Sequence, residues 1–216
     1  MESIFEETEQ YQYLTDREIF SKIWFSPREV FKYIRYRNYD KYVTALLILA
    51  GVSRAFDKAA DKGMGDTMSL WGIIGLCVFV GGVVGWCISG IYAGLINWTG
   101  KWLKGQGDTK SILNVMAYAY IPSILSLILL VPELSIYGVE IFKTNGDIIS
   151  AGISSNILFY GALIIEAILG VWTVVLLIIG VAETQQFSIG KAIVNLLLPI
   201  LIIFLPLFLL GILVSK

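Results

Sequence analysis

The chain has 216 residues, of which 56% are hydrophobic and only 15% are charged, and its formal net charge is −1. The mean hydropathy is +0.75. This composition lies far from that of soluble domains, and the nearly balanced charge gives no support for binding of nucleic acid. We therefore expect an all-α membrane protein whose first partner is the lipid bilayer.

The N-terminal segment, residues 1–40, is the only sizeable polar part of the chain. A segment of about 40 residues rarely builds an independent core, so no separate soluble domain is expected. Ser26, Pro27 and Glu29 carry the signals of a helix start: an N-cap residue, a proline in the first turn and a glutamate placed for a capping box. Residues 1–12 are acidic and polar, unlike a signal peptide.

The helix that begins at Pro27 is predicted to run to about Asn38 and to be amphipathic. Its apolar side chains lie beside basic ones, which is the mixture expected of a helix in the lipid headgroup region. One interpretation is that this helix anchors the chain to anionic lipid. The other is that it forms a docking surface for a cytoplasmic protein, with the candidate docking residues Arg28, Phe31, Arg35 and Arg37.

Five segments are predicted to cross the membrane, because a helix of about 20 apolar residues spans the hydrocarbon core. Their approximate bounds are 41–60, 69–99, 111–132, 156–181 and 191–214. The first segment is the weakest, since Arg54 and Asp57 interrupt it. Their spacing places both side chains on one helix face, where the two charges partly neutralise each other. An even number of spans, with this first segment on the membrane surface, stays open.

The distribution of Lys and Arg sets the expected orientation. With five spans, eleven basic residues fall on the side of the N-terminus and five on the opposite side. The prediction is therefore a multi-pass membrane protein with its N-terminus in the cytoplasm and its C-terminus outside.

Two of the predicted spans contain features with two interpretations each. Gly81, Gly85 and Ser89 recur at every fourth position, so they either allow close helix packing or mark a flexible helix beside a pathway. Such packing also leaves a homo-oligomer open. Pro122 lacks a backbone N–H and is expected to kink the third span near Tyr118, as ordinary bundle architecture or as part of a site.

Glu166 is the most informative polar residue within a predicted span. A carboxylate at such depth costs a few kcal/mol unless it is paired, hydrated or protonated. Its neighbours on the same helix face include Ala162 and Gly170, which indicates that it faces the bundle, where it could donate a hydrogen bond to a residue such as Asn97. Structural and functional roles both stay open for the candidate polar site, which comprises Glu166, Asn97, Tyr118, Arg54 and Asp57.

The sequence argues against an enzyme. It contains no histidine, which excludes Ser-His-Asp and Cys-His catalysis and the common histidine metal motifs. Cys77 and Cys87 lie in one predicted helix, about 15 Å apart along its axis and beyond disulfide reach. We expect no catalytic residue, no cofactor and no bound metal.

Three further segments occur in a characteristic order: residues 23–31 (IWFSPREVF), 117–123 (AYAYIPS) and 179–192 (IGVAETQQFSIGKA). They resemble the Yip domain family, and the resemblance extends from about Phe20 to the C-terminus. It implies a cytoplasmic segment, residues 1–40, followed by an all-helical domain of five spans, residues 41–216. The eukaryotic relatives bind prenylated Rab GTPases and act in vesicle traffic. This chain has a short N-terminal segment, lacks the Asp-Leu-Tyr-Gly-Pro motif and is more similar to the bacterial branch. The resemblance therefore implies a location in the inner (plasma) membrane rather than the Golgi, and Rab binding is not carried over.

Two hypotheses about function follow. In the first, the protein is a non-enzymatic membrane scaffold or adaptor that binds a membrane or cytoplasmic protein through its N-terminal helix and the loop around Phe187. In the second, it is a small transporter or channel-like protein whose polar site around Glu166 lines a hydrated path. The resemblance favours the first hypothesis, whereas the residues alone leave the two nearly level.

Overall fold

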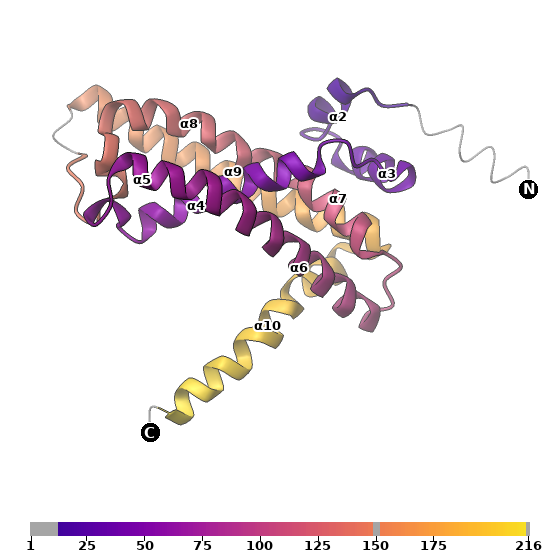
Figure 1. The fold of residues 1–216 in the computed structure, drawn as a ribbon. Coiled ribbons are helices and arrows are strands. Elements are labelled where there is room, and N and C mark those ends of the chain that lie inside the picture. Colours follow the sequence, from indigo (N-terminus) through magenta and orange to yellow (C-terminus); the bar gives the residue numbers. More distant parts are fainter. Residues whose placement is uncertain (1–12, 149–151, 215–216) are drawn as a thin grey trace, which may run out of the picture. The chain divides into compact units, whose positions relative to one another are not determined.

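The computed structural model describes residues 13–148 and 152–214, and every regular element within these ranges is a helix (Figure 1). The predicted all-α class is confirmed for this part of the chain. Residues 1–12, which were predicted not to form a signal peptide, lie outside the described residues. The chain forms two compact units: unit 1 combines Met1–Lys41, Ile96–Val115 and Ile178–Lys216, and unit 2 combines Tyr42–Leu95 and Met116–Leu177.

The helices divide between these units. Unit 2 contains α4 (Val43–Asp61), η1 (Met64–Asp66), α5 (Leu70–Gly75), the π-helical η2 (Leu76–Gly81), α8 (Ile121–Tyr137) and η3 (Gly138–Phe142). Unit 1 contains α2 (Asp16–Lys22), α3 (Pro27–Arg37) and α10 (Ile189–Val214). Both units receive residues from α6 (Gly82–Trp102), α7 (Thr109–Ala119) and α9 (Ile153–Gln185).

Three helical stretches among the described residues are long and apolar enough to cross a membrane: Leu70–Trp102, Thr109–Phe142 and Asn156–Gln185. α10 adds a shorter apolar helix, Ile189–Ile203. The second half of α4 carries four charged residues, Arg54, Asp57, Lys58 and Asp61. The predicted multi-pass membrane protein is thereby supported, whereas the count of five spans stays a prediction.

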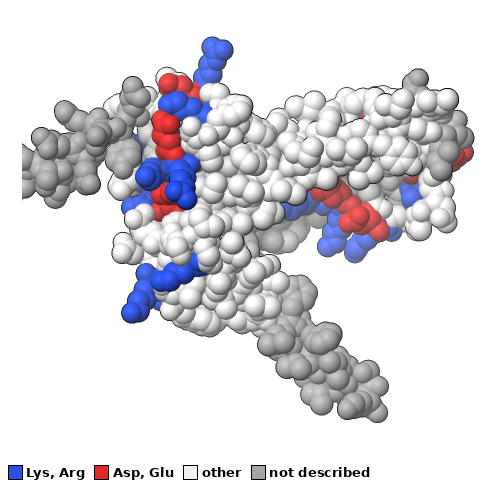
Figure 2. All heavy atoms as spheres, turned by 180° about the vertical axis from the view of Figure 1, so that it is seen from behind, with Lys and Arg blue, Asp and Glu red and all other residues white. Residues whose placement is uncertain are grey.

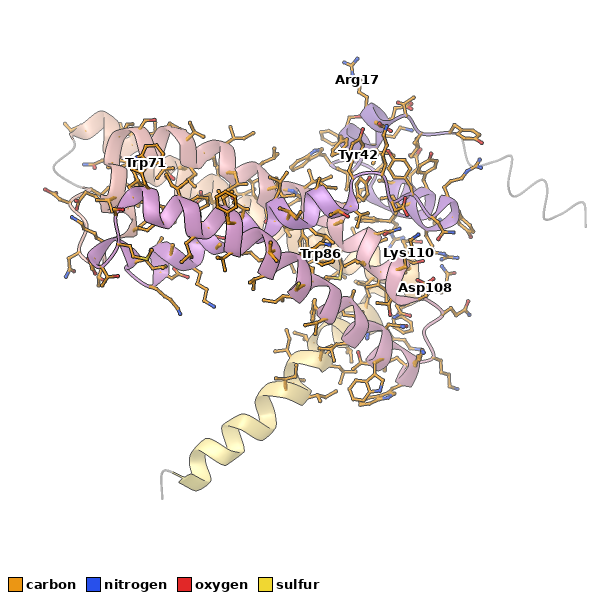
Figure 3. The ribbon with its side chains drawn as sticks, in the orientation of Figure 1. Arg17, Tyr42, Trp71, Trp86, Asp108 and Lys110 are labelled. Atoms are coloured by element: carbon orange, nitrogen blue, oxygen red, sulfur yellow. The ribbon has the colours of Figure 1, made fainter. Side chains whose placement is uncertain are left out.

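Large apolar side chains cover much of the described surface. The exposed fraction is 78% for Trp71 and 45% for Trp86, both labelled in Figure 3. In Figure 2 uncharged residues occupy most of the visible surface, and Lys, Arg, Asp and Glu gather in a few patches. Soluble monomers rarely expose so much contiguous apolar surface, whereas helices that face lipid do.

Glycines bring α4 into close contact with the start of the α6 stretch. A Cβ atom on Gly51 would lie 2.6 Å from the carbonyl oxygen of Gly81 and 2.8 Å from Cα of Gly85, which leaves no room for a side chain. By contrast, a Cβ atom on Gly90 or Gly94 would meet nothing within 4 Å among the described residues. Gly81 and Gly85 therefore allow close helix packing, as in the first of the two interpretations, and the contact lies inside the bundle of unit 2.

The helix is interrupted at Tyr120, between α7 and α8 and two residues before Pro122. The amide N–H of Ser123 donates to Oγ1 of Thr173 in α9 over 3.1 Å, and the hydroxyl of Ser53 in α4 donates to the carbonyl of Ser123 over 3.0 Å. Polar groups that a helix break exposes need such partners within a membrane. Two neighbouring helices thus hold the break at Pro122 in place, as expected of bundle architecture.

The N-terminal part of the chain corrects one local prediction. A helix begins at Pro27, but Ser26 makes no side-chain capping bond, and Glu29 instead forms an ion pair of 2.7 Å with Lys22. The capping box predicted there is therefore wrong. A complete capping box starts α2 instead, where Thr15 and Glu18 exchange hydrogen bonds.

Candidate functional site

The apolar face of α3 is buried inside unit 1. Val30, Phe31 and Ile34 are all buried, and Phe31 has no exposed surface. Its ring lies beside α9, since a Cβ atom on Gly180 would come within 3.4 Å of the Phe31 ring. Phe31 therefore packs α3 within unit 1, and its role as a docking residue stays a prediction.

Two arginines of α3 attach the helix to the end of α9. Arg35 donates from Nη1 to the carbonyl of Glu183 over 2.6 Å, and Nε of Arg28 lies 3.8 Å from the carboxylate of the same residue. The last carbonyls of a helix lack intrahelical donors and carry partial negative charge, so cations there are stabilising. Arg35 is therefore engaged within unit 1, whereas Arg28 stays largely exposed.

The opposite face of α3 points to the outside of unit 1. Arg28, Lys32 and Tyr36 recur at every fourth position and are all exposed. Phe25, in the turn that precedes α3, has an exposed fraction of 91%. We refer to these four residues as the α3 stripe. Arg37 lies beside the stripe, with its guanidinium 4.2 Å from the centre of the Tyr13 ring.

The loop after α9 is organised around Gln185, which is 1% exposed. Its Oε1 accepts from the amide of Gly107 over 3.0 Å, and its backbone carbonyl accepts from the amide of Gln106 over 3.2 Å. A Cβ atom on Gly100 or Gly105 would collide with the Gln185 side chain. The polar run around Gln185 therefore joins the α6–α7 connection to the end of α9.

Phe187, the other predicted docking residue, belongs to the same loop. Its amide donates to the carbonyl of Ala182 over 2.9 Å, and a Cβ atom on Gly105 would come within 2.8 Å of its ring. The ring is half-buried. Phe187 thus contributes to packing of unit 1 and leaves only part of its surface for a partner.

The polar residues predicted within the membrane fall into both units. In unit 2 the guanidinium of Arg54 lies 4.1 Å from the centre of the Tyr120 ring, and no ion pair joins Arg54 to Asp57 there. Arg54 thus contacts an aromatic ring, and the expected partial neutralisation of Arg54 and Asp57 stays a prediction. Tyr118 is fully buried in the same unit.

Asn97 lies in unit 1, where its Nδ2 donates to Oγ1 of Thr109 over 2.9 Å. The suggested hydrogen bond between Asn97 and Glu166 would join different units, so it stays a prediction.

Asp57 and Glu166 share a cavity of about 300 Å³ in unit 2. The cavity is formed by α4, α8, η3 and α9, and two further carboxylates line it, those of Asp61 and Glu133. Glu133 was not among the predicted site residues, because it follows Pro132 at the end of an uncharged run and so resembles the polar end of a span. Among the described residues, no group of three or more acidic or cysteine side chains is arranged to hold a metal ion.

Comparison with known proteins agrees with the segments noted in the sequence. The model of the Yip1 domain matches residues 21–211. No curated protein and no solved structure matches the chain. The matched range contains α3, the break at Pro122 and the loop around Gln185, which are the three places where the resemblance was found. Because this match covers most of its length, the chain belongs to the Yip1 domain family of membrane proteins.

Proposed function

We propose that this protein is a non-enzymatic membrane adaptor whose α3 stripe docks a protein partner at the cytoplasmic face of the inner (plasma) membrane. The observation that carries the proposal is that α3 has one buried apolar face and one exposed face. Its apolar face is buried in unit 1, while Phe25, Arg28, Lys32 and Tyr36 are exposed on the other side.

This division supports the interpretation of the N-terminal helix as a docking surface. A helix lying in the headgroup region inserts its apolar face between lipids. In α3 that face packs against Gly180 instead, and Arg35 and Arg28 tie the helix to Glu183. A helix held in this way presents a rigid basic and aromatic surface, and aromatic residues and Arg are the side chains that dominate binding energy at protein interfaces.

The chemistry of the stripe defines the partner. Arg28, Lys32 and Tyr36 lie on one face of α3, and the exposed Phe25 lies in the turn just before the helix. Charge complementarity favours an acidic surface with an apolar groove for the aromatic rings. We therefore assign the stripe to an acidic cytoplasmic or membrane-bound protein, with self-association as the competing outcome of the test.

The test is photo-cross-linking in cells. A photoreactive phenylalanine analogue replaces Phe25, and a matched control replaces Phe31, which has the same ring but no exposed surface. We expect a discrete heterologous protein product from position 25, none from position 31, and loss of the product in Arg28→Glu/Lys32→Glu. Products that contain only lipid or only this protein at position 25 would contradict the adaptor.

The proposed topology has five spans, a cytoplasmic N-terminus and an external C-terminus. The packing of α4 against Gly81 and Gly85 supports α4 as the first span, because these glycines belong to an apolar stretch long enough to cross the membrane. Cysteines placed at Asn38 and Met64, on either side of α4, test it with an impermeant thiol reagent in a Cys87→Ser background. Labelling of both from the same side would show that α4 does not span.

The alternative, a small transporter or channel-like protein, is favoured by one observation, the cavity that Asp57 and Glu166 share. Binding in that cavity and docking at α3 involve different units, so each can be tested without the other.

A further inference from the structure

Three helices, α4, α8 and α9, contribute carboxylates to the lining of the cavity in unit 2. α4 contributes Asp57 and Asp61, which are four residues apart, and α8 and α9 contribute Glu133 and Glu166. Residues spaced by three or four share a helix face, so Asp57 and Asp61 lie on the same side of α4. The remaining wall is largely apolar and includes the rings of Phe142 and Phe159.

No Lys or Arg lines this cavity. The basic residues nearest in sequence on α4 are Arg54 and Lys58, and Arg54 is engaged with the Tyr120 ring. Within the described chain none of the four carboxylates forms an ion pair. Asp57 and Asp61 are exposed, whereas Glu133 is buried and Glu166 is half-buried. Glu133 and Glu166 are therefore the poorly solvated carboxylates, and a nearby positive charge would stabilise their ionised forms.

Glu133 gives an independent indication of a ligand. Its exposed fraction is 5%, it lines the cavity, and it makes no hydrogen bond or ion pair with any other described residue. Buried polar groups in folded proteins are almost always hydrogen-bonded, and buried charges are almost always paired. A buried carboxylate that lines a cavity and has no protein partner is expected where a bound ligand supplies the partner.

The shape of the site selects the kind of ligand. The described carboxylates do not form a group able to hold a metal ion, so a small inorganic cation lacks a ligand set. A volume of about 300 Å³ lies within the range of small-molecule sites. Aromatic rings bind cations through their faces, and quaternary ammonium groups are the ligands most typical of such contacts.

We propose that this cavity binds an organic ammonium cation, with the charge beside Glu133 and Glu166 and the apolar body against Phe142 and Phe159. The ligand neutralises the carboxylates of Glu133 and Glu166, and its hydrocarbon groups contact the apolar wall. This binding is separate from the adaptor function, because it uses no residue of the α3 stripe.

Isothermal titration calorimetry on the purified full-length protein in detergent tests the proposal. Choline and tetraethylammonium are the probes, and 3,3-dimethylbutan-1-ol, which has the shape of choline without its charge, is the neutral control. Sodium chloride at matched concentration controls for ionic strength. We expect saturable binding of at least one cation and at least tenfold weaker binding of the neutral alcohol.

Variants separate charge from folding. Glu133→Gln and Glu166→Gln should each weaken cation binding at least tenfold, whereas Glu29→Gln, which removes a carboxylate in unit 1, should leave it unchanged. Leu130→Phe fills the cavity and should abolish binding with all carboxylates retained, and gel filtration verifies that each variant is folded. Equal binding of cation and alcohol, or undiminished binding in both glutamine variants, would overturn the proposal. Absence of binding by either cation would show that protons alone neutralise the carboxylates, which also overturns it.

Discussion

Gly51 of α4 and Gly85 of α6 meet backbone to backbone: a Cβ atom on Gly51 would lie 2.8 Å from Cα of Gly85. Small residues allow helices to approach this closely in membranes, where packing and not water exclusion holds helices together. The contact is therefore a principal support of unit 2.

Gly51→Ala should destabilise the protein. The new methyl group would meet backbone atoms that cannot move aside as a side chain could, and overpacking of this kind costs about 1–3 kcal/mol. Gly90→Ala is the matched control, since nothing lies within 4 Å of its added Cβ; it should be neutral or stabilising by up to about 1 kcal/mol through helix propensity. Thermal unfolding in detergent measures both. Equal stability of the two variants would mean that the glycine contact is not close in the membrane.

Gln185→Ala should destabilise unit 1. The substitution leaves the amide of Gly107 without its acceptor and opens a space between three glycines, and an unsatisfied buried donor costs about 1–3 kcal/mol. Gln186→Ala, one residue later and exposed, should change stability by no more than about 0.5 kcal/mol. Denaturant unfolding that cannot tell the two variants apart would refute a structural role for Gln185.

Thr173→Val tests the support of the helix break. The valine keeps the shape of threonine but removes the oxygen that accepts from the amide of Ser123, so we expect a loss of about 1–3 kcal/mol. Thr67→Val, in which the lost hydroxyl is exposed, is the control. Hydrogen exchange should show faster exchange of the Ser123 amide in Thr173→Val alone. Unchanged protection there would mean that another group holds the break.

The ion pair of Asp40 and Lys110, with 2.9 Å between the charged atoms, predicts a pH dependence in unit 1. The hydrogen bond from Lys110, together with its charge, lowers the pKa of Asp40 below its ordinary value. Because the folded-state pKa is the lowered one, the pair stabilises the fold above the unfolded pKa of about 3.9 and loses this effect as the pH falls through the folded value.

Lys110→Met should return the Asp40 pKa to its ordinary value, as followed by NMR of ¹³C-labelled carboxylates. Lys101→Met, which removes an exposed charge in the same unit, should leave it low. The effect on stability should be small, because both side chains are more than half exposed. An Asp40 pKa that stays low without Lys110 would assign the shift to another cause.

The positions of the helices could be inferred from the sequence to a large extent. Long uncharged runs and the Ser26-Pro27 signal each coincide with helix in the structure, because periodicity and caps are local properties of the chain. The capping box at Ser26 could not be judged in this way. Whether Glu29 turns back to cap its own helix or pairs with Lys22 depends on a competitor in another helix.

The arrangement around Gln185 and the cavity of unit 2 could not be derived from the sequence for a different reason. Each depends on segments far apart in the chain: Gly100 and Gly107 meet Gln185, and Asp57 meets the surroundings of Glu133. Periodicity indicates which face of a helix is apolar but not which helix it faces. A carboxylate directly after a proline resembles the end of a span until its neighbours are known.

The glycine contact of α4 has a consequence for how the protein is made. α4 is too rich in charge in its second half to partition readily into a bilayer by itself, and its closest packing partner, the stretch from Gly81 to Gly85, follows it in the chain. Synthesis proceeds from the N-terminus, so α4 leaves the ribosome before that partner exists. With α4 as the proposed first span, we expect it to stay at the membrane surface at first and to insert only together with the following helix, so that the order of insertion differs from the order of translation.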